Sequence, residues 1–321
     1  MNVSLALGGG GTKGLAHIGV IDCLEKAGLH IAAVAGTSIG GLVGAFYAAG
    51  HSPTQILAMV EQLTPARLYA RRSSDGPGLL GYQGLADLLT QVLGDTEFSA
   101  LKIPFACTAV DLRSAREVYL NTGRVVDSAL ATMAIPGIFP PMHLAGADLI
   151  DGGVLDPVPV RLARLLAPNL PVIAVVLNPD RDQWDQLPQF SITSPVPLPI
   201  PTQIIEGFAR MRVGRALQIF VQSIDITARM LTELRLEVDQ PEVIIRPAVH
   251  QYGMLDSIDP HILYQAGVEA AQAEMPRIQR ETSWSSTVFR IMRRPSYRKS
   301  EAEKEKRSIQ ALVKRLGRSE L

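Results

Sequence analysis

The chain has 321 residues, 47% of them hydrophobic, which is enough for a globular protein with a large buried core. Its formal net charge is zero, so the overall charge does not point to nucleic acid or an acidic ligand, and we expect no nucleic-acid partner. The two cysteines, Cys23 and Cys107, lie in apolar segments without metal-ligand spacing, which predicts buried free thiols in a reducing compartment.

Neither a secretion signal nor a membrane span is predicted near the N-terminus. The first residues lack a basic segment and have too short an apolar core for a signal peptide. Residues 27–60 carry no charge and are long enough to cross a bilayer, but several glycines and Pro53 divide them into shorter elements. We therefore expect a buried α/β core in a cytoplasmic protein, which could also sit at the inner face of a membrane.

Apolar runs and helical spacings predict an alternation of strands and helices. Strands are expected at 3–7, 31–35, 104–110, 116–120, 148–150, 171–177 and 242–246, and helices at 14–27, 39–49, 53–63, 125–133, 203–236 and 260–280. Residues 70–82 read as an exposed loop and residues 135–141 as a Pro-rich turn. The alternation favours a parallel sheet with helices on its faces.

The first glycine-rich turn, "GGGGTKG" at residues 8–14, follows a predicted strand and precedes a helix. Gly9, Gly11 and Gly14 fit the dinucleotide-binding spacing, but the second strand ends without the carboxylate that a ribose would need. The same loop could instead direct backbone N–H groups, for which Gly10 and Gly11 are the candidates, at a developing oxyanion. Lys13 either adds a positive charge nearby or anchors the loop as a solvated side chain.

The second such turn, "GTSIG" at residues 36–40, has the spacing of a nucleophile elbow. It also lies between a strand and a helix, where flanking Gly36 and Gly40 let the chain turn sharply and expose the hydroxyl of Ser38. Both turns would open at the carboxyl edge of one sheet, where sites in such folds form. Ser38 is therefore the candidate nucleophile.

A serine nucleophile needs a base, and the sequence offers two kinds. None of the histidines has a convincing local setting, although His250 and His261 fall in the chain order of a Ser–Asp–His triad; the six are His17, His30, His51, His143, His250 and His261. Asp151 follows a short strand and precedes Gly152 and Gly153, which would bring its carboxylate close to other backbone. An aspartate can act as the base if it touches the serine or if burial raises its pKa.

Taken together, the three motifs resemble those of the patatin-like phospholipases. The glycine loop (Gly9 to Gly14, with Thr12 and Lys13), the elbow (Gly36, Thr37, Ser38, Ile39, Gly40) and the "DGG" at Asp151–Gly153 match in order and spacing, and "IPGIFPP" at 135–141 resembles the segment that forms the family's pocket. The resemblance implies a three-layer α/β/α sandwich with a mainly parallel central sheet. It further implies a Ser38–Asp151 dyad with the glycine loop as oxyanion hole.

The same resemblance implies a serine acyl hydrolase of the phospholipase A or lysophospholipase type. Its substrate would be a phospholipid, a lysophospholipid or another lipid ester, and its chemistry requires neither cofactor nor metal. The alternative is a non-catalytic lipid- or protein-binding module that retains the fold.

The expected organisation is one domain followed by a tail. Residues 4–165 would form the catalytic core, residues 166–282 would complete the domain with a Pro-rich surface segment at 181–202, and residues 283–321 would form a basic tail, disordered or amphipathic. Residues 290–321 hold eleven Lys and Arg against four Glu. We expect this tail to make a reversible contact with anionic membrane.

Overall fold

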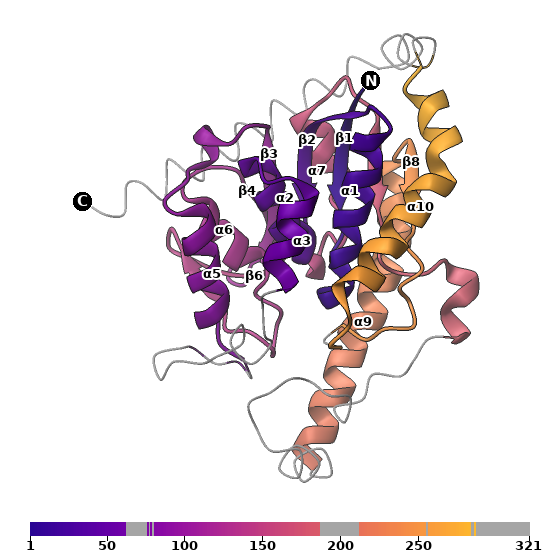
Figure 1. Cartoon of the computed structure of the whole chain (residues 1–321). Helices are drawn as coiled ribbons and strands as arrows, with labels where there is room; N and C mark the ends of the chain where they lie inside the picture. Colours follow the sequence, from indigo (N-terminus) through magenta and orange to yellow (C-terminus); the bar gives the residue numbers. More distant parts are fainter. Residues whose placement is uncertain are drawn as a thin grey trace.

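One mixed sheet with helices on both faces organises the chain (Figure 1). The structure, a computed structural model, describes residues 1–61, 76, 78, 80–186, 212–254, 256–283 and 286. Most of the loop expected at 70–82, the greater part of the Pro-rich segment at 181–202, the start of the helix expected at 203–236 and the basic tail at 290–321 lie outside the described residues.

Eight strands of the described chain form the sheet, in the order β5-β6-β3-β2-β1-β7-β8, with β4 also paired to β3. The strands β8, β7, β1, β2 and β3 run parallel, whereas β4 and β6 are antiparallel to β3 and β5 is antiparallel to β6. Their bounds are β1 Asn2–Leu7, β2 His30–Gly36, β3 Phe105–Asp111, β4 Arg116–Leu120, β5 Met142–Leu144, β6 Ala147–Asp151, β7 Val172–Val175 and β8 Val243–Ile245.

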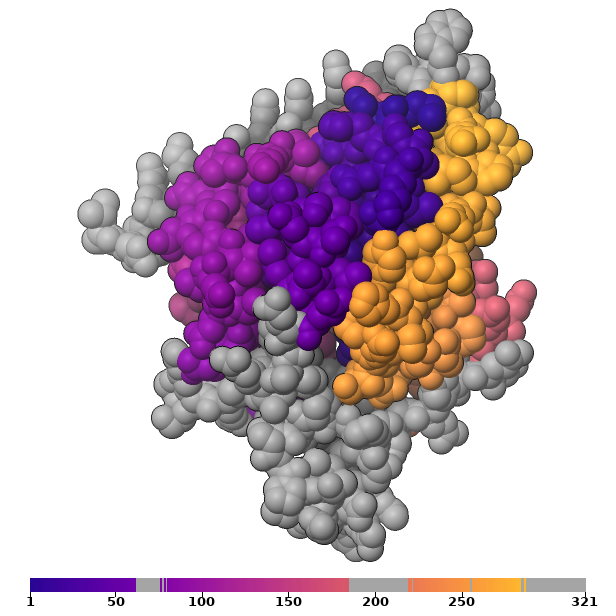
Figure 2. Space-filling model, viewed as in Figure 1, coloured from indigo at the N-terminus to yellow at the C-terminus, as the bar shows by residue number. Residues whose placement is uncertain are grey.

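The helices lie on the two faces of this sheet, with α1 and α10 side by side on one of them (Figure 2). Their bounds are α1 Ala16–Lys26, α2 Ile39–Ala49, α3 Pro53–Glu61, α5 Gln83–Leu93, α6 Val125–Thr132, α7 Val160–Leu166, α9 Arg212–Asp239 and α10 Pro260–Glu281. Short 3₁₀ turns are η1 Gly11–Leu15, η2 Phe98–Ala100, η3 Gly152–Val154 and η4 Arg181–Gln186. The three-layer α/β/α architecture with a mainly parallel sheet is therefore confirmed.

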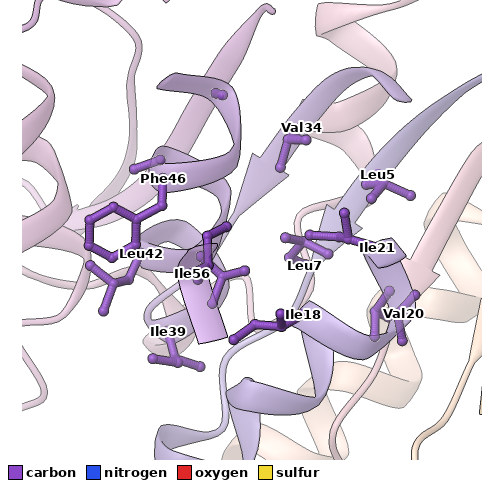
Figure 3. Close-up of a cluster of buried hydrophobic side chains, with 14 of the residues drawn as sticks. Leu5, Leu7, Ile18, Val20, Ile21, Val34, Ile39, Leu42, Phe46 and Ile56 are labelled. Atoms are coloured by element: carbon purple, nitrogen blue, oxygen red, sulfur yellow. The ribbon is translucent and has the colours of Figure 1, made fainter. Parts of the chain in front are cut away.

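The two faces of the sheet are packed differently because strand side chains alternate between them. Toward α1 and α2, the strands present large side chains that form the main core with helical residues, drawn in Figure 3: Leu5, Leu7, Ile18, Val20, Ile21, Val34, Ile39, Leu42, Phe46 and Ile56. Toward α7, they present the small side chains Ala6, Ala35, Ala106 and Ala174. The alanines let α7 approach closely enough for the hydroxyl of Ser4 to donate to the carbonyl of Ala163 at 2.9 Å.

The predicted helices and strands within the described residues are all present, with shifted ends. Two helices, α5 and α7, and one strand, β5, were not predicted. Helix α5 could have been predicted from the sequence, because Leu85, Leu89 and Leu93 recur every four residues. All three side chains are buried in the structure. Helix α7 and the three-residue strand β5 are too short for a periodic signal. The uncharged stretch at 27–60 forms β2, α2 and α3, and no described helix is long and apolar enough to span a membrane.

Helices α1 and α10 touch through two glycines. A Cβ on Gly19 would lie 1.9 Å from the carbonyl oxygen of Tyr264, and one on Gly267 would lie 2.0 Å from the carbonyl oxygen of Ala16. The obstacle is backbone in both cases, so a side chain cannot move aside to relieve the contact. These glycines therefore set the distance between the two helices.

We expect Gly19→Ala to lower the free energy of unfolding by about 1–3 kcal/mol or more, because the added methyl forces the helices apart. Urea denaturation followed by circular dichroism measures this loss. Gln272→Ala, a substitution at an exposed position of α10, serves as the control and should change stability little. Equal denaturation midpoints for the two variants would contradict the role given to the glycine contact.

Candidate active site

The register of the sheet brings the three sequence motifs to one edge. The glycine loop follows β1 and Ser38 follows β2, and these neighbouring parallel strands end together. Strand β3 links the third motif to them, since Cys107 pairs with Gly36 of β2 and Ala109 pairs with Asp151 of β6. One strand, β3, therefore separates Asp151 on β6 from the strand β2 that leads to Ser38.

Ser38 occupies a strained backbone conformation at the start of α2. Its φ of 55° and ψ of −126° are unusual for a residue with a side chain. The flanking glycines are required by close contacts: a Cβ on Gly36 would lie 2.4 Å from the carbonyl oxygen of Gly40, and a Cβ on Gly40 would lie 2.2 Å from that of Leu7. This geometry is that of a nucleophile elbow, in which the turn exposes the serine hydroxyl.

Ser38 is held in place by Thr132, the last residue of α6, and by Met133, which follows it. The backbone N–H of Ser38 donates to Oγ1 of Thr132 at 2.9 Å, and its Oγ lies 3.9 Å from Sδ of Met133. Because its own N–H is engaged by Thr132, Ser38 cannot use that donor for a bound oxyanion. The sequence did not predict either contact with Ser38, because no local motif links these residues to the elbow.

The carboxyl group of Asp151 is buried and lies beside the serine hydroxyl. Burial raises the pKa of Asp151 to about 6, and hydrogen bonds from the side chain of Ser38 and the backbone N–H of Gly153 limit the rise. The Gly153 N–H donates to Oδ1 of Asp151 at 2.7 Å, and the N–H of Asp151 donates to the carbonyl of Ala134. Gly152 admits no side chain, since its Cβ would lie 2.0 Å from Oγ1 of Thr108.

The glycine loop presents two unused backbone donors next to Ser38. Gly8 N–H donates to the carbonyl of Val175 and Gly9 N–H to that of Pro157, whereas the N–H groups of Gly10 and Gly11 have no hydrogen-bond partner within the part of the chain that the structure describes. A Cβ on Gly9 would lie 3.3 Å from Cβ of Ser38, so the loop passes directly against the serine. The loop that passes against Ser38 therefore carries two N–H groups that are free to donate to a ligand.

Segment 249–254 closes the other side of the loop. The carbonyl of Met254 accepts hydrogen bonds from the N–H and the hydroxyl of Thr12, at 2.9 and 3.1 Å. Gly11 has a φ of 61°, and a Cβ there would lie 2.1 Å from the same carbonyl oxygen. Gly14 is packed against the side chain of Ile39.

Lys13 is not the solvated anchor that the sequence left open, because its exposed fraction is only 6%. Burial lowers the pKa of Lys13, and the nearby charges of Asp225, Arg229 and Asp256 partly offset one another. Two of these three residues belong to α9. Lys13 therefore joins the glycine loop to α9 electrostatically.

His17 lies close to the site but is engaged elsewhere. It is fully buried, its Nε2 lies 2.8 Å from the carbonyl oxygen of Gly8, and burial lowers its pKa to about 4. The ring is therefore neutral at pH 7 and its Nε2–H donates to Gly8 at the start of the loop. Of the other histidines, His143 pairs with Asp148 and His261 with Glu61 on the surface, and no hydrogen bond joins a histidine to Ser38 among the described residues.

The side chains of Thr37 and Thr108 form hydrogen bonds that support the elbow. The hydroxyl of Thr37 donates to the backbone carbonyl of Asp156 at 2.9 Å and lies 2.7 Å from that of Thr108. The side chain of Asp156 is buried beside Glu117, and burial together with that neighbouring charge raises its pKa well above the usual range. Thr37 was expected only as part of the elbow motif, and its partners lie too far along the chain for a sequence pattern to reveal.

Helix α9 is tied to the loop that follows Asp151. Nη2 of Arg235 donates to the carbonyl of Leu155 at 3.0 Å and lies 3.5 Å from Oε2 of Glu117. The described residues contain no group of three or more His, Cys, Asp or Glu side chains arranged to hold a metal ion. The chemistry available at this edge is that of a buried hydroxyl, a buried carboxyl group and two free N–H donors.

Comparisons with known proteins agree on one family. The patatin-like phospholipase model matches residues 5–164. An uncharacterised NTE family protein of Mycobacterium tuberculosis is 36% identical over 179 residues, which cover 55% of this chain and 49% of the mycobacterial protein. The lysophospholipase nte1 of Emericella nidulans is 25% identical over 309 residues, 88% of this chain and 18% of the fungal protein. This chain thus spans about half or less of the length of these relatives.

The crystal structure of VipD from Legionella pneumophila is a more distant match. It covers 86% of this chain and 66% of VipD, with 12% identity and a TM-score of 0.44. The family assignment rests on the sequence comparisons and on the order of the three motifs. Through residues 5–164, which hold all three motifs, this chain belongs to the patatin-like phospholipase family.

Proposed function

We propose that this protein is a serine acyl hydrolase of the phospholipase A or lysophospholipase type, with Ser38 as nucleophile and Asp151 as base. The observation that carries the proposal is the pair itself: a serine at a strained elbow whose hydroxyl lies close enough to a buried carboxyl group to lower the pKa of that group. Membership of a lipid-hydrolase family supports the substrate class. The name of the fungal relative, a lysophospholipase, supports the narrower choice among lipid esters.

Acylation would begin with attack of Ser38 Oγ on the ester carbonyl carbon while the hydroxyl proton passes to Asp151. The tetrahedral intermediate carries its negative charge on the former carbonyl oxygen, where the N–H groups of Gly10 and Gly11 would stabilise it. When the C–O bond to the leaving alcohol breaks, Asp151 returns the proton to that alcohol. The products of this half-reaction are a free alcohol and an acyl ester on Ser38.

Deacylation would repeat the same steps with water as the nucleophile. Asp151 takes a proton from the water, the oxyanion forms again at the glycine loop, and collapse breaks the ester bond to Ser38. The serine recovers its proton from Asp151 and the fatty acid leaves. A base with a pKa of about 6 suits both directions, because it is ionised at neutral pH yet still binds a proton better than an ordinary carboxylate.

The acyl chain would lie against the apolar segment that follows α6. Met133 borders the serine, and beyond it Ile135, Ile138 and Phe139 form a buried cluster with Leu80. Tyr82 stacks on Phe139 with ring centroids 5.2 Å apart and donates to the carbonyl of Pro140. This cluster coincides with the "IPGIFPP" turn and supports a hydrophobic substrate group over a polar one.

We expect Ser38→Ala and Asp151→Asn each to lower hydrolysis of a soluble short-chain nitrophenyl ester by about three orders of magnitude or more, because the two residues act as a unit. A fluorophosphonate probe should label the unmodified protein at Ser38. His250→Gln and His261→Gln are the matched controls and should retain activity. A folded histidine variant without activity would restore a triad, and absence of labelling would favour a non-catalytic binding module.

The pKa of Asp151 predicts the pH dependence of this reaction. The base must be ionised to accept the proton of Ser38, so kcat/KM should fall as the pH falls through about 6 and reach a plateau above it. A pH–rate profile of the unmodified protein measures the midpoint. An ordinary carboxylate would give a midpoint near 4 instead. A midpoint there would mean that the buried state of Asp151 does not govern the reaction.

Gly10→Ala tests the oxyanion donors. The φ of Gly10, 163°, suits any residue, but the new Cβ would lie 2.7 Å from Cδ1 of Leu177 and displace the loop. Loss of one donor should lower kcat about 10²–10³-fold with a smaller change in KM. The double variant Gly10→Ala with Leu177→Ala gives the methyl group room and should recover part of kcat. A Gly10→Ala variant that keeps the wild-type kcat would exclude the loop from the oxyanion hole.

A further inference from the structure

Helix α9 exposes a row of large apolar side chains, here called the apolar stripe: Ile219, Phe220, Ile226, Met230, Leu234 and Val238. At 100° per residue, these six positions fall within about a third of the helix circumference. Their exposed fractions range from 38% at Met230 to 76% at Val238. Thr232 and Leu236, on the opposite side, are buried.

The stripe carries no charge over most of its length. Among the side chains described from residue 219 to residue 238, the exposed ones outside the stripe are Ser223, Thr227 and Glu237, of which only Glu237, near the C-terminal end, is charged. A surface helix normally turns charged or polar residues outward, and a contiguous apolar surface on a globular protein usually marks a binding site. The outward face of α9 is therefore suited to an apolar environment.

The opposite face of the same helix is attached to the active-site loops. Asp225 and Arg229 act on the buried Lys13 of the glycine loop, and Arg235 holds the carbonyl of Leu155 after the "DGG" motif. Figure 1 shows that the N-terminal end of α9 projects past the other helices. The helix that carries the stripe is therefore fixed to the loop that follows Asp151 and lies near the charge of Lys13 in the glycine loop.

The size of the stripe decides between two kinds of occupant. The stripe runs from Ile219 to Val238, so at about 1.5 Å per residue and about 10 Å across it offers roughly 300 Å². A stable interface with a second copy needs about 800 Å² from each partner. An amphipathic helix that lies at a lipid surface needs no more than its own apolar face. The area therefore favours lipid.

We propose that the apolar stripe of α9 is a lipid-docking surface that lies in the boundary between headgroups and acyl chains. Docking there would hold the carboxyl edge of the sheet against the membrane or micelle that contains the substrate. The role of docking in catalysis rests on the proposed function, but the binding of lipid by the stripe does not require hydrolysis. Because the six side chains of the stripe are uncharged and the exposed charge beside them, Glu237, is acidic, docking does not require anionic lipid.

The test is co-sedimentation of the full-length protein with phosphatidylcholine vesicles. The triple variant Ile226→Ser, Met230→Ser, Leu234→Ser should bind at least about tenfold more weakly than the unmodified protein, because three large apolar side chains are lost from the contact. The matched control is Leu112→Ser with Ile262→Ser, which removes two comparably exposed apolar side chains elsewhere and should bind normally. Binding of the unmodified protein should persist in about 1 M salt, where charge attraction is screened beyond about 3 Å.

Three results would overturn the proposal. The triple variant, shown to be folded by circular dichroism, could bind as well as the unmodified protein. Binding could require anionic vesicles and vanish in salt, which would indicate the basic segment at 290–321. Light scattering without lipid could show a dimer that the triple variant converts to monomers, which would identify a second copy as the occupant. Hydrolysis of a soluble ester decides the proposed function separately from all three.

Discussion

The site depends on how closely two backbone turns approach each other at the carboxyl edge of the sheet. The start of α2 lies so near the end of β1 that a Cβ on Gly40 would be 2.2 Å from the carbonyl oxygen of Leu7, and the loop passes within van der Waals contact of Ser38. No residue other than glycine fits at Gly40 without moving a strand. This approach brings the loop that carries the free N–H groups of Gly10 and Gly11 against the strained serine, and the rest of the site is built around it.

Burial gives that edge its chemistry. An exposed carboxyl group would be a weak base, but Asp151 loses water on all sides, so the ionised form is less favoured and its pKa rises. The same removal of water keeps His17 neutral, which lets its ring donate to Gly8. The buried surroundings come from the unequal faces of the sheet, where large side chains fill one layer and alanines admit α7 to the other.

Helix α9 connects the site to the protein surface. The charges of its inner face act on Lys13 of the glycine loop, its Arg235 binds the loop that follows Asp151, and its outer face is largely apolar and exposed. The sequence predicted a long helix in this region, and its apolar residues would ordinarily be assigned to the core. Which side of the helix meets the protein depends on distant partners such as Glu117 and Leu155, so the helical period did not reveal an exposed stripe.

Sequence alone determined the parts of this protein that depend on neighbouring residues. Glycines after an apolar run end a strand in a sharp turn, so the loop at 8–14, the elbow around Ser38 and the expected sheet edge followed from local chemistry and from the family resemblance. Tertiary structure alone decided the interactions between distant segments. Asp151 lies near Ser38 through the register of β3, Thr132 accepts the hydrogen bond of the serine N–H, and Lys13 is buried within the influence of the charges on α9. These contacts set burial and pKa, and both are properties of the packed chain because water is excluded only when all the layers are in place.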